Sequence, residues 1–272
     1  MAKNGKTAMS LSEIATLAFG KNLGEQDIFT YPRFDELQSL LKLAAEQKAM
    51  AMITGKAGVG KTTAVRTWTN QLPNNRYQVL YFGQDQDGSN LLRRCALSFG
   101  LRPKFRRPEL ILQVSHALSD NAREGGKEIV AVVDEAHLFD DHTLEDIRLL
   151  TNADFDTSSP ITIILLGQQA LRLKLKVPSF DALNQRLRYR FFLEGFSKDD
   201  AAAYINHRLA AVGAPLDLFR EGAIEKIFDA AEGVPREVNN ICALALIRAE
   251  AQGLEQVDEK IVKQVIVQRD LS

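Results

Sequence analysis

The feature that most constrains the fold is a glycine-rich segment between an apolar run and a helical pattern. Residues 54–63, TGKAGVGKTT, match the pattern G-x-x-x-x-G-K-[ST]. The fixed positions of that pattern are Gly55, Gly60, Lys61 and Thr62. A strand over 49–54 that leads into a helix over 62–71 lets backbone N–H groups converge on a phosphate at the helix N-terminus. The alternative is a glycine turn that has no ligand.

The first 195 residues alternate between two patterns. Besides 49–54, apolar runs typical of buried strands occur at 77–83, 129–135, 161–167 and 188–194. Helical spacing separates these runs, at 62–71, 89–99, 108–123, 142–152 and 168–176. Such alternation is typical of a parallel sheet with crossover helices. We therefore predict an α/β domain built on five parallel strands.

The pattern changes after Glu194. From there on the sequence holds amphipathic helical patterns, and Ser197 with Asp200 resembles a helix N-cap. Ser10 and Glu13 form a similar capping box for a short helix near the N-terminus. We predict an N-terminal extension (1–27), a nucleotide-binding α/β domain (28–195) and a small all-α domain (196–272).

Composition narrows the function classes. The 272 residues have a net charge of −1, so binding to nucleic acid would need a local basic patch. Cys95 and Cys242 fit no metal-ligand spacing, and we expect reduced thiols. The sequence shows neither a signal peptide nor a run of about 18 apolar residues. We expect a cytoplasmic protein without a membrane partner.

The chemistry of a phosphate loop assigns roles to several residues. Lys61 is expected to reach the β- and γ-phosphates, and the Thr62 hydroxyl is expected to hold Mg²⁺. The cofactors are therefore expected to be ATP and Mg²⁺. The expected nucleotide-binding residues are Gly55, Ala57, Gly58, Val59, Gly60, Lys61, Thr62, Thr63 and Arg236.

An acidic pair ends the apolar run IVAVVDEAH. Asp134 is placed to orient Mg²⁺ together with Thr62, and Glu135 is placed to polarise an attacking water. The alternative is an acidic strand end without a catalytic role. His137 completes the tetrad DEAH, but helicases with that tetrad need two motor domains and this chain has room for one. We interpret His137 as a polar neighbour of the site.

Polar residues further along complete the candidate site. Gln168 follows an apolar strand, where its amide is expected to contact the γ-phosphate or the water; the alternative is a polar residue that starts a helix.

The segment NQRLRYRFF spaces three arginines two apart, at Arg186, Arg188 and Arg190. An arginine from a neighbouring subunit stabilises phosphate charge, while surface ion pairing is the alternative. In EGVPRE, Arg236 follows a proline at a helix start and is expected to contact phosphates or to face solvent. The expected catalytic residues are Lys61, Glu135, Gln168 and Arg186.

One segment concentrates positive charge. Residues 88–108 contain six basic residues and no acidic one, with Phe105 among them. The basic residues are Arg93, Arg94, Arg102, Lys104, Arg106 and Arg107. Such a density neutralises phosphates and gives sequence-tolerant DNA binding. The alternative is a solvated helix face followed by a proline-bounded loop.

Taken in order, the motifs resemble those of the AAA+ ATPases. The segments are GKAGVGKTT, VVDEAH, ILLGQQAL, NQRLRYRF and GVPREVNNICALAL. More narrowly, residues 28–268 resemble the general secretion pathway protein A group and the Mu B and TniB type of transposition ATPase. Because the membrane segment and envelope-binding domain of the secretion member have no counterpart in this sequence, we expect the transposition branch.

The resemblance implies a five-stranded AAA+ P-loop core followed by an all-α lid, with ATP bound between subunits of a ring or helical filament. It places Walker A at Lys61 and Thr62 and Walker B at Asp134 and Glu135. It also places sensor 1 at Gln168, where Asn or Thr is more usual, the arginine finger at Arg186 and sensor 2 at Arg236. In the transposition ATPases, the stretch that corresponds to 88–108 faces a DNA-filled channel.

These observations favour an ATPase that oligomerises on double-stranded DNA and recruits or activates a transposase. Two alternatives stay open: an accessory ATPase of secretion or envelope assembly, and a nucleotide-gated signalling scaffold that binds no nucleic acid. The sequence does not decide the subunit number, the arginine that acts in trans or the role of the first 27 residues.

Overall fold

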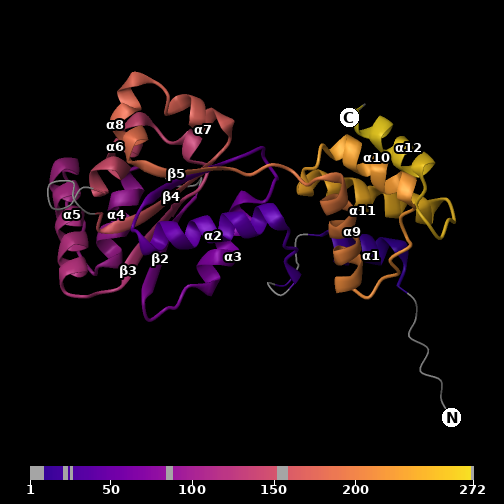
Figure 1. The fold of residues 1–272 in the computed structure, drawn as a ribbon, viewed down its shortest axis with the longest axis horizontal. Helices are drawn as coiled ribbons and strands as arrows, with labels where there is room; N and C mark the ends of the chain where they lie inside the picture. Colours follow the sequence, from indigo (N-terminus) through magenta and orange to yellow (C-terminus); the bar gives the residue numbers. More distant parts are fainter. Residues whose placement is uncertain (1–8, 21–23, 25–26, 84–87, 152–158, 271–272) are drawn as a thin grey trace, which may run out of the picture. The chain divides into compact units, whose positions relative to one another are not determined.

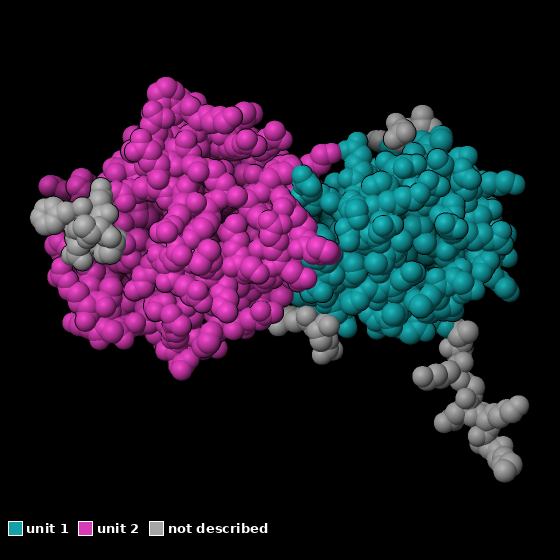
Figure 2. All heavy atoms as spheres, viewed as in Figure 1, with its two compact units in different colours: residues 1–31, 58–60, 194–272 teal, residues 32–57, 61–193 magenta. Residues whose placement is uncertain are grey.

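The computed structural model describes residues 9–20, 24, 27–83, 88–151 and 159–270. The described residues form two compact units (Figure 2). Unit 2 contains Pro32–Ala57 and Lys61–Leu193, and unit 1 contains Gly58–Gly60 with the described parts of Met1–Tyr31 and Glu194–Ser272. The predicted domain limits at 27 and 195 remain a proposal.

Unit 2 is built on one parallel sheet in the strand order β2-β3-β4-β1-β5 (Figure 1). The strands are β1 (Met50–Thr54), β2 (Tyr77–Phe82), β3 (Glu128–Val133), β4 (Ile161–Gly167) and β5 (Leu187–Phe192). β1 and β4 are buried at every position because they lie inside the sheet, whereas the edge strand β2 has exposed positions. The prediction of a five-stranded parallel sheet is confirmed.

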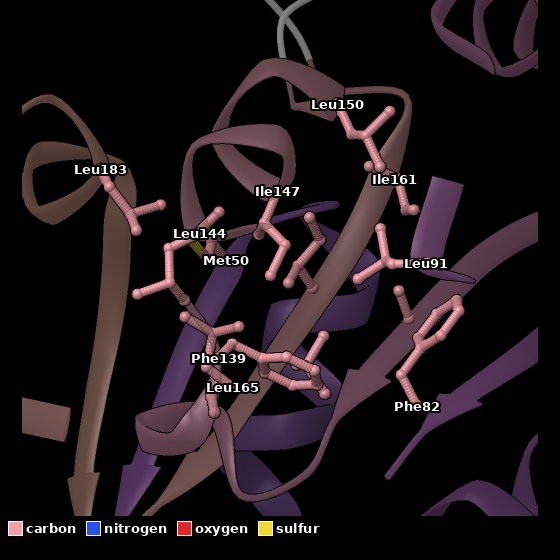
Figure 3. Close-up of a cluster of buried hydrophobic side chains, with 14 of the residues drawn as sticks. Met50, Phe82, Leu91, Phe139, Leu144, Ile147, Leu150, Ile161, Leu165 and Leu183 are labelled. Atoms are coloured by element: carbon pink, nitrogen blue, oxygen red, sulfur yellow. The ribbon is translucent and has the colours of Figure 1, made fainter. Parts of the chain in front are cut away.

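Helices cover the sheet and enclose its core (Figure 1). They are α2 (Pro32–Glu46), α3 (Lys61–Gln71), α4 (Gly88–Ser98), α5 (Arg107–Arg123), α6 (Asp141–Leu150), α7 (Gln169–Lys174) and α8 (Asp181–Arg186), with short 3₁₀ turns η2 (Ala136–Leu138) and η4 (Pro178–Phe180). A cluster of buried side chains joins the sheet to α4, α5, α6 and α8. Figure 3 shows Leu144 and Ile147 of α6 and Leu183 of α8 pointing toward strand residues such as Leu165.

The strand register brings three strand ends to one edge of the sheet. Thr54 of β1 pairs with Gly167 of β4, and Val133 of β3 pairs with Leu165 of β4. Because the strands are parallel, the segments that follow β1, β3 and β4 leave the sheet at the same edge. In α/β proteins this edge is where ligands bind.

Unit 1 is helical in its described part. Its helices are α1 (Leu11–Phe19), α9 (Lys198–Ala211), α10 (Glu221–Ala231), α11 (Pro235–Ala251) and α12 (Glu259–Asp270). Both predicted capping boxes are present, at the starts of α1 and α9. The buried Arg208 of α9 donates to the backbone oxygens of Ala18 and Gly20, and so satisfies carbonyl groups at the C-terminal end of α1.

Both cysteines are free and buried, Cys95 in α4 and Cys242 in α11. Burial raises the pKa of the Cys95 thiol to about 12, and it raises that of Cys242 well above its usual value.

Within the described residues, the helices are too short or too polar to cross a membrane. The same residues contain no group of three or more His, Cys, Asp or Glu side chains that could hold a metal ion.

Candidate nucleotide site

The loop from β1 to α3 has a backbone suited to an anion. Gly58 and Gly60 have φ values of +82° and +99°, which L side chains rarely adopt. Such turns aim successive N–H groups at a common point, as in phosphate-binding nests. α3 begins at Lys61, directly after the loop, and adds the positive end of its dipole.

Lys61 is fixed against this loop. Its side chain is buried, with 5% of the residue exposed. Nζ donates to the backbone oxygens of Gly55 and Lys56, each at 3.0 Å, and these carbonyl groups supply part of what a buried ammonium needs. The ammonium therefore lies at the loop backbone, where the sequence predicts the phosphates.

Two oxygen-bearing side chains meet where α3 begins and β3 ends. Thr62 Oγ1 donates to Asp134 Oδ2 at 2.7 Å, and Asp134 Oδ1 accepts from the backbone N–H of Glu135 at 2.8 Å. Asp134 is buried, so these hydrogen bonds hold a carboxylate that has lost most of its water. A hydroxyl beside a carboxylate fits the oxygen ligands that Mg²⁺ prefers.

Tyr81 is a member of this cluster that sequence reasoning missed. Its hydroxyl donates to the same Asp134 Oδ2 at 2.8 Å, from the neighbouring strand β2. Partial burial and the hydrogen bond to Asp134 raise the pKa of Tyr81 to about 12, so the phenol keeps its proton at neutral pH. Pairing β2 with β3 in register would have placed Tyr81 opposite Val132, close to the acidic pair.

Glu135 follows in a left-handed conformation, with φ +51° and ψ +38°. Its Oε2 is buried and lies 3.3 Å from Nδ1 of His137, a nitrogen that is also 3.5 Å from the backbone N of Gln168. One imidazole nitrogen cannot donate to Glu135 and accept from Gln168 at once. We assign the proton to Nδ1, because Oε2 has no other hydrogen-bond partner among the described residues and the contact to Gln168 is long.

The structure therefore brings Glu135, His137 and the start of α7 together. Gln168 is the N-cap residue of α7, and its side chain makes no capping hydrogen bond. It directly follows β4, the strand between β1 and β3. The expected sensor position thus lies at the same sheet edge as the loop and the acidic pair.

The three spaced arginines occupy two elements. Arg186 ends α8, and Arg188 and Arg190 are exposed, alternate positions of the edge strand β5. Nη2 of Arg190 donates to the backbone oxygen and Oδ1 of Asn184, at 2.6 and 2.9 Å. Arg190 therefore ties β5 to the last turn of α8 within its own unit.

Within unit 1, Arg236 lies at the first turn of α11, with Pro235 at the helix start as predicted. Its backbone N–H donates to the oxygen of Gly58 at 3.3 Å. A Cβ on Gly58 would lie 2.8 Å from the Cβ of Arg236, so this approach needs glycine. The side chain of Arg236 is exposed.

The six basic side chains of segment 88–108 differ in how exposed they are and in what they contact. Arg93 and Arg94 are half-buried in α4, and Arg94 lies over the Phe82 ring at 4.9 Å. Arg107 binds Asp146, with Nη2 2.6 Å from Oδ1 and Nε 3.2 Å from Oδ2. The exposed cations of the loop before α5 are Arg102, Lys104 and Arg106.

Comparison with known proteins gives a consistent family. Residues 44–175 match the AAA domain family. General secretion pathway protein A of Aeromonas hydrophila is 32% identical over 209 residues, which are 76% of this chain and 38% of that protein. The chain thus spans well under half the length of that relative. ATP-dependent target DNA activator B of Escherichia phage Mu is 25% identical over 250 residues, which are 88% of this chain and 74% of that protein.

The fold is also that of a solved structure in this class. Cdc6p from Pyrobaculum aerophilum aligns with a TM-score of 0.65 and 16% identity, over 89% of this chain and 68% of that one. At this identity the likeness concerns the fold alone. General secretion pathway protein A and target DNA activator B, in contrast, are proteins of the type that the sequence motifs resembled. Residues 44–175 form an AAA domain, and with a five-stranded parallel sheet and a phosphate loop at its edge the chain has the P-loop fold of the AAA+ ATPases.

Proposed function

We propose that the chain hydrolyses ATP and uses the bound nucleotide to assemble on double-stranded DNA and to recruit or activate a transposase. The observation that carries the proposal is the convergence of Lys61, Thr62, Asp134 and Glu135 at one edge of the sheet. A phosphate loop without hydrolysis would not need an acidic residue beyond the metal ligand. Glu135 is that further residue.

Each residue has a defined task in this proposal. The loop N–H groups and Lys61 hold the β- and γ-phosphates, and Thr62 and Asp134 hold Mg²⁺, which neutralises phosphate charge. Tyr81 fixes the Asp134 carboxylate through its hydrogen bond to Oδ2. Glu135 takes a proton from the attacking water, with His137 orienting its carboxylate. Gln168 orients that water or contacts the γ-phosphate.

DNA binding is assigned to the segment 88–108. The exposed side chains of Arg102, Lys104 and Arg106 supply a local positive surface on a chain of net charge −1. Contacts of this kind are made to phosphates and carry no base sequence. The relative from phage Mu is named a target DNA activator, which supports DNA as the partner.

Assembly between copies is assigned to the nucleotide. In this proposal Arg186 of one subunit contacts the phosphates bound to the next, and Arg236 links the same nucleotide to the helical unit. ATP then stabilises the contact between subunits, and hydrolysis weakens it. The family resemblance supports this arrangement as a ring or a helical filament.

A second candidate function is an accessory ATPase of secretion or envelope assembly. The observation that favours it is the 32% identity to general secretion pathway protein A. That function needs no DNA, so DNA binding separates the two candidates.

The test is binding of the full chain to a mixed-sequence duplex with ATP, ADP or a non-hydrolysable analogue, at several salt concentrations. We expect binding with ATP and the analogue that falls steeply with added salt. Reversing Lys104 and Arg106 to Glu should weaken binding by about tenfold or more and leave ATP binding unchanged.

The matched control reverses Lys42 and Lys127, which are exposed, belong to the same unit and lie outside the basic segment. This control makes the same change in net charge, so an equal loss of binding in both variants would argue for a net-charge effect. Absence of DNA binding with the analogue at low salt would refute the proposal and favour a function without nucleic acid.

A further inference from the structure

The loop between α4 and α5 is tied down at its first half by one side chain. Nε2 of Gln113 donates to the backbone oxygen of Arg102 at 3.0 Å, and its Oε1 accepts from the backbone N–H of Lys104 at 3.0 Å. Gln113 lies two turns inside α5, so it bonds the loop to the helix that follows. The single side-chain amide of Gln113 thus fixes the loop backbone twice, with its NH₂ as donor and its carbonyl oxygen as acceptor.

The second half of the loop is tied down by an ion pair. Arg107, the first residue of α5, makes two hydrogen bonds to Asp146 of α6 and one to the backbone oxygen of His142 at 2.9 Å. Asp146 is only 3% exposed, and a carboxylate at such depth needs its partner. Phe105 therefore lies between two fixed points of the backbone.

Phe105 itself points into solvent. It is 91% exposed, and the next most exposed large apolar side chain among the described residues, Leu173, is 61% exposed. Burying a phenylalanine side chain stabilises a folded protein, and the exposed Phe105 ring does not contribute this stabilisation. An apolar surface is available nearby, since a groove of about 710 Å³ beside α5 is lined by residues such as Phe99, Leu101 and Leu112. Phe105 is not among its lining residues, so the anchored loop keeps the ring free.

The neighbours of the ring identify its partner. Lys104 and Arg106 flank Phe105 and are exposed, and Arg106 is paired only loosely, with 4.0 Å between Nη1 and Glu109 Oε1. An exposed aromatic ring between cations suits a nucleic acid, because the cations bind phosphates while the ring stacks on a base. Apolar side chains inserted between base steps of a duplex act in this way.

We infer that Phe105 is a base-contacting residue, which inserts its ring against a base step of the bound duplex while Arg102, Lys104 and Arg106 hold the flanking phosphates. This inference rests on the proposed DNA binding and adds local unstacking of the duplex to it. The two anchors keep the loop conformation unchanged on binding, so little conformational entropy is lost.

The experiment uses the full chain with a non-hydrolysable ATP analogue and a duplex that carries 2-aminopurine, whose fluorescence rises when a base unstacks. We expect the wild-type protein to raise this signal. Phe105→Ala should abolish the rise and weaken binding by about tenfold, because base–aromatic stacking is lost. The slope of affinity against salt should not change, since no phosphate contact is removed.

Two further variants sharpen the result. Phe105→Trp should restore both the signal and the affinity, because indole also stacks. Leu112→Ala removes another exposed apolar side chain, from the neighbouring α5, and should leave DNA binding as in the wild type.

The possible failures are distinguishable. If the wild type binds DNA and Phe105→Ala gives the same affinity and signal, the inference is overturned and the ring is left to contact a protein. If Phe105→Ala lowers the salt slope as well, the loop rather than the ring matters, which also overturns it. If the wild type binds no duplex, the proposed function fails and this inference fails with it.

Discussion

Glu135, the proposed catalytic base, has a backbone and a side-chain contact that set it apart from its neighbours. Its left-handed backbone costs about 1 kcal/mol or more, and such strain is common at functional positions. The turn places the carboxylate directly after Asp134, the proposed Mg²⁺ ligand, and its Oε2 lies 3.3 Å from Nδ1 of His137. The Asp134 carboxylate is meanwhile held by Tyr81 and Thr62. The two acidic side chains are adjacent in sequence but have separate partners, which fits separate roles.

His137→Ala should lower the kcat of ATP hydrolysis by about tenfold and leave the affinity for ATP unchanged. The physical reason is that Glu135 Oε2 loses the donor that orients it, while the phosphate contacts remain. Steady-state kinetics and equilibrium nucleotide binding check this split. His137→Gln, which keeps a donor, should recover part of the rate. An unchanged kcat in His137→Ala would mean that Glu135 is oriented by other groups.

At the level of elements, α5 and α6 are joined by a buried charge. Burial raises the pKa of Asp146, and Arg107 opposes that shift. Because its folded-state pKa is above the unfolded value, Asp146 favours folding most at low pH and loses that contribution as the pH rises through the folded value. Arg107 makes the ionised form tolerable at neutral pH. The pair thus fixes the start of α5 and the end of the basic loop at the same time.

Arg107→Ala should lower the free energy of unfolding by about 1–3 kcal/mol at neutral pH, because it leaves a buried carboxylate without its cation. The loss should shrink as the pH falls toward about 4, where the carboxyl takes up a proton in both folded and unfolded chains. Urea unfolding at the two pH values measures the difference.

Arg106→Ala serves as the control, since Arg106 is exposed and only 4.0 Å from Glu109. Its effect on stability should stay within about 0.5 kcal/mol. In an Asp146→Asn background the cost of Arg107→Ala should largely disappear. A full loss in that background would assign the effect to packing by the arginine stem.

Much at the element level could be predicted from the sequence. Val- and Ile-rich runs gave five parallel strands, and Ser10 and Ser197 gave helix starts, because periodicity and capping are local properties. Contacts between distant residues could not be predicted in this way. Tyr81 reads as an ordinary strand residue, and only the pairing of β2 with β3 brings its hydroxyl to Asp134. Likewise, the number of basic residues in 88–108 led us to assign Arg107 to DNA binding together with Lys104, but Arg107 forms an ion pair with Asp146.

For the whole molecule, the proposal makes activity a property of the assembly. A site that draws Glu135 from one copy and Arg186 from the next is incomplete in a monomer. Arg186 has the position that the sequence predicts, at the end of α8, just before the edge strand β5. An edge strand is a place where a second copy can approach without disturbing the sheet core.

Glu135→Gln should lower ATP turnover by about a hundredfold and prolong the life of ATP-dependent oligomers, because the subunit contact is no longer broken by hydrolysis. Light scattering after size-exclusion chromatography follows the oligomers. A turnover rate equal to that of the wild type would show that Glu135 is not the base.

Mixing two inactive variants tests whether Arg186 acts on the nucleotide of a neighbouring subunit. Glu135→Gln and Arg186→Ala are each expected to be inactive, but in an equal random mixture about a quarter of the interfaces contain both wild-type residues. Recovered turnover in the mixture would place Arg186 in trans. The same mixing with Arg188→Ala and Arg190→Ala identifies the acting residue if Arg186→Ala alone stays active.

The depth of Cys95 and Cys242 has a practical consequence for such experiments. Both thiols are fully buried and their pKa values are raised, so neither forms a thiolate readily at neutral pH. A cysteine introduced in place of Phe105 would therefore be the group that a maleimide dye modifies in the folded protein. The native sequence can carry a single reporter at the loop tip without prior removal of its own cysteines.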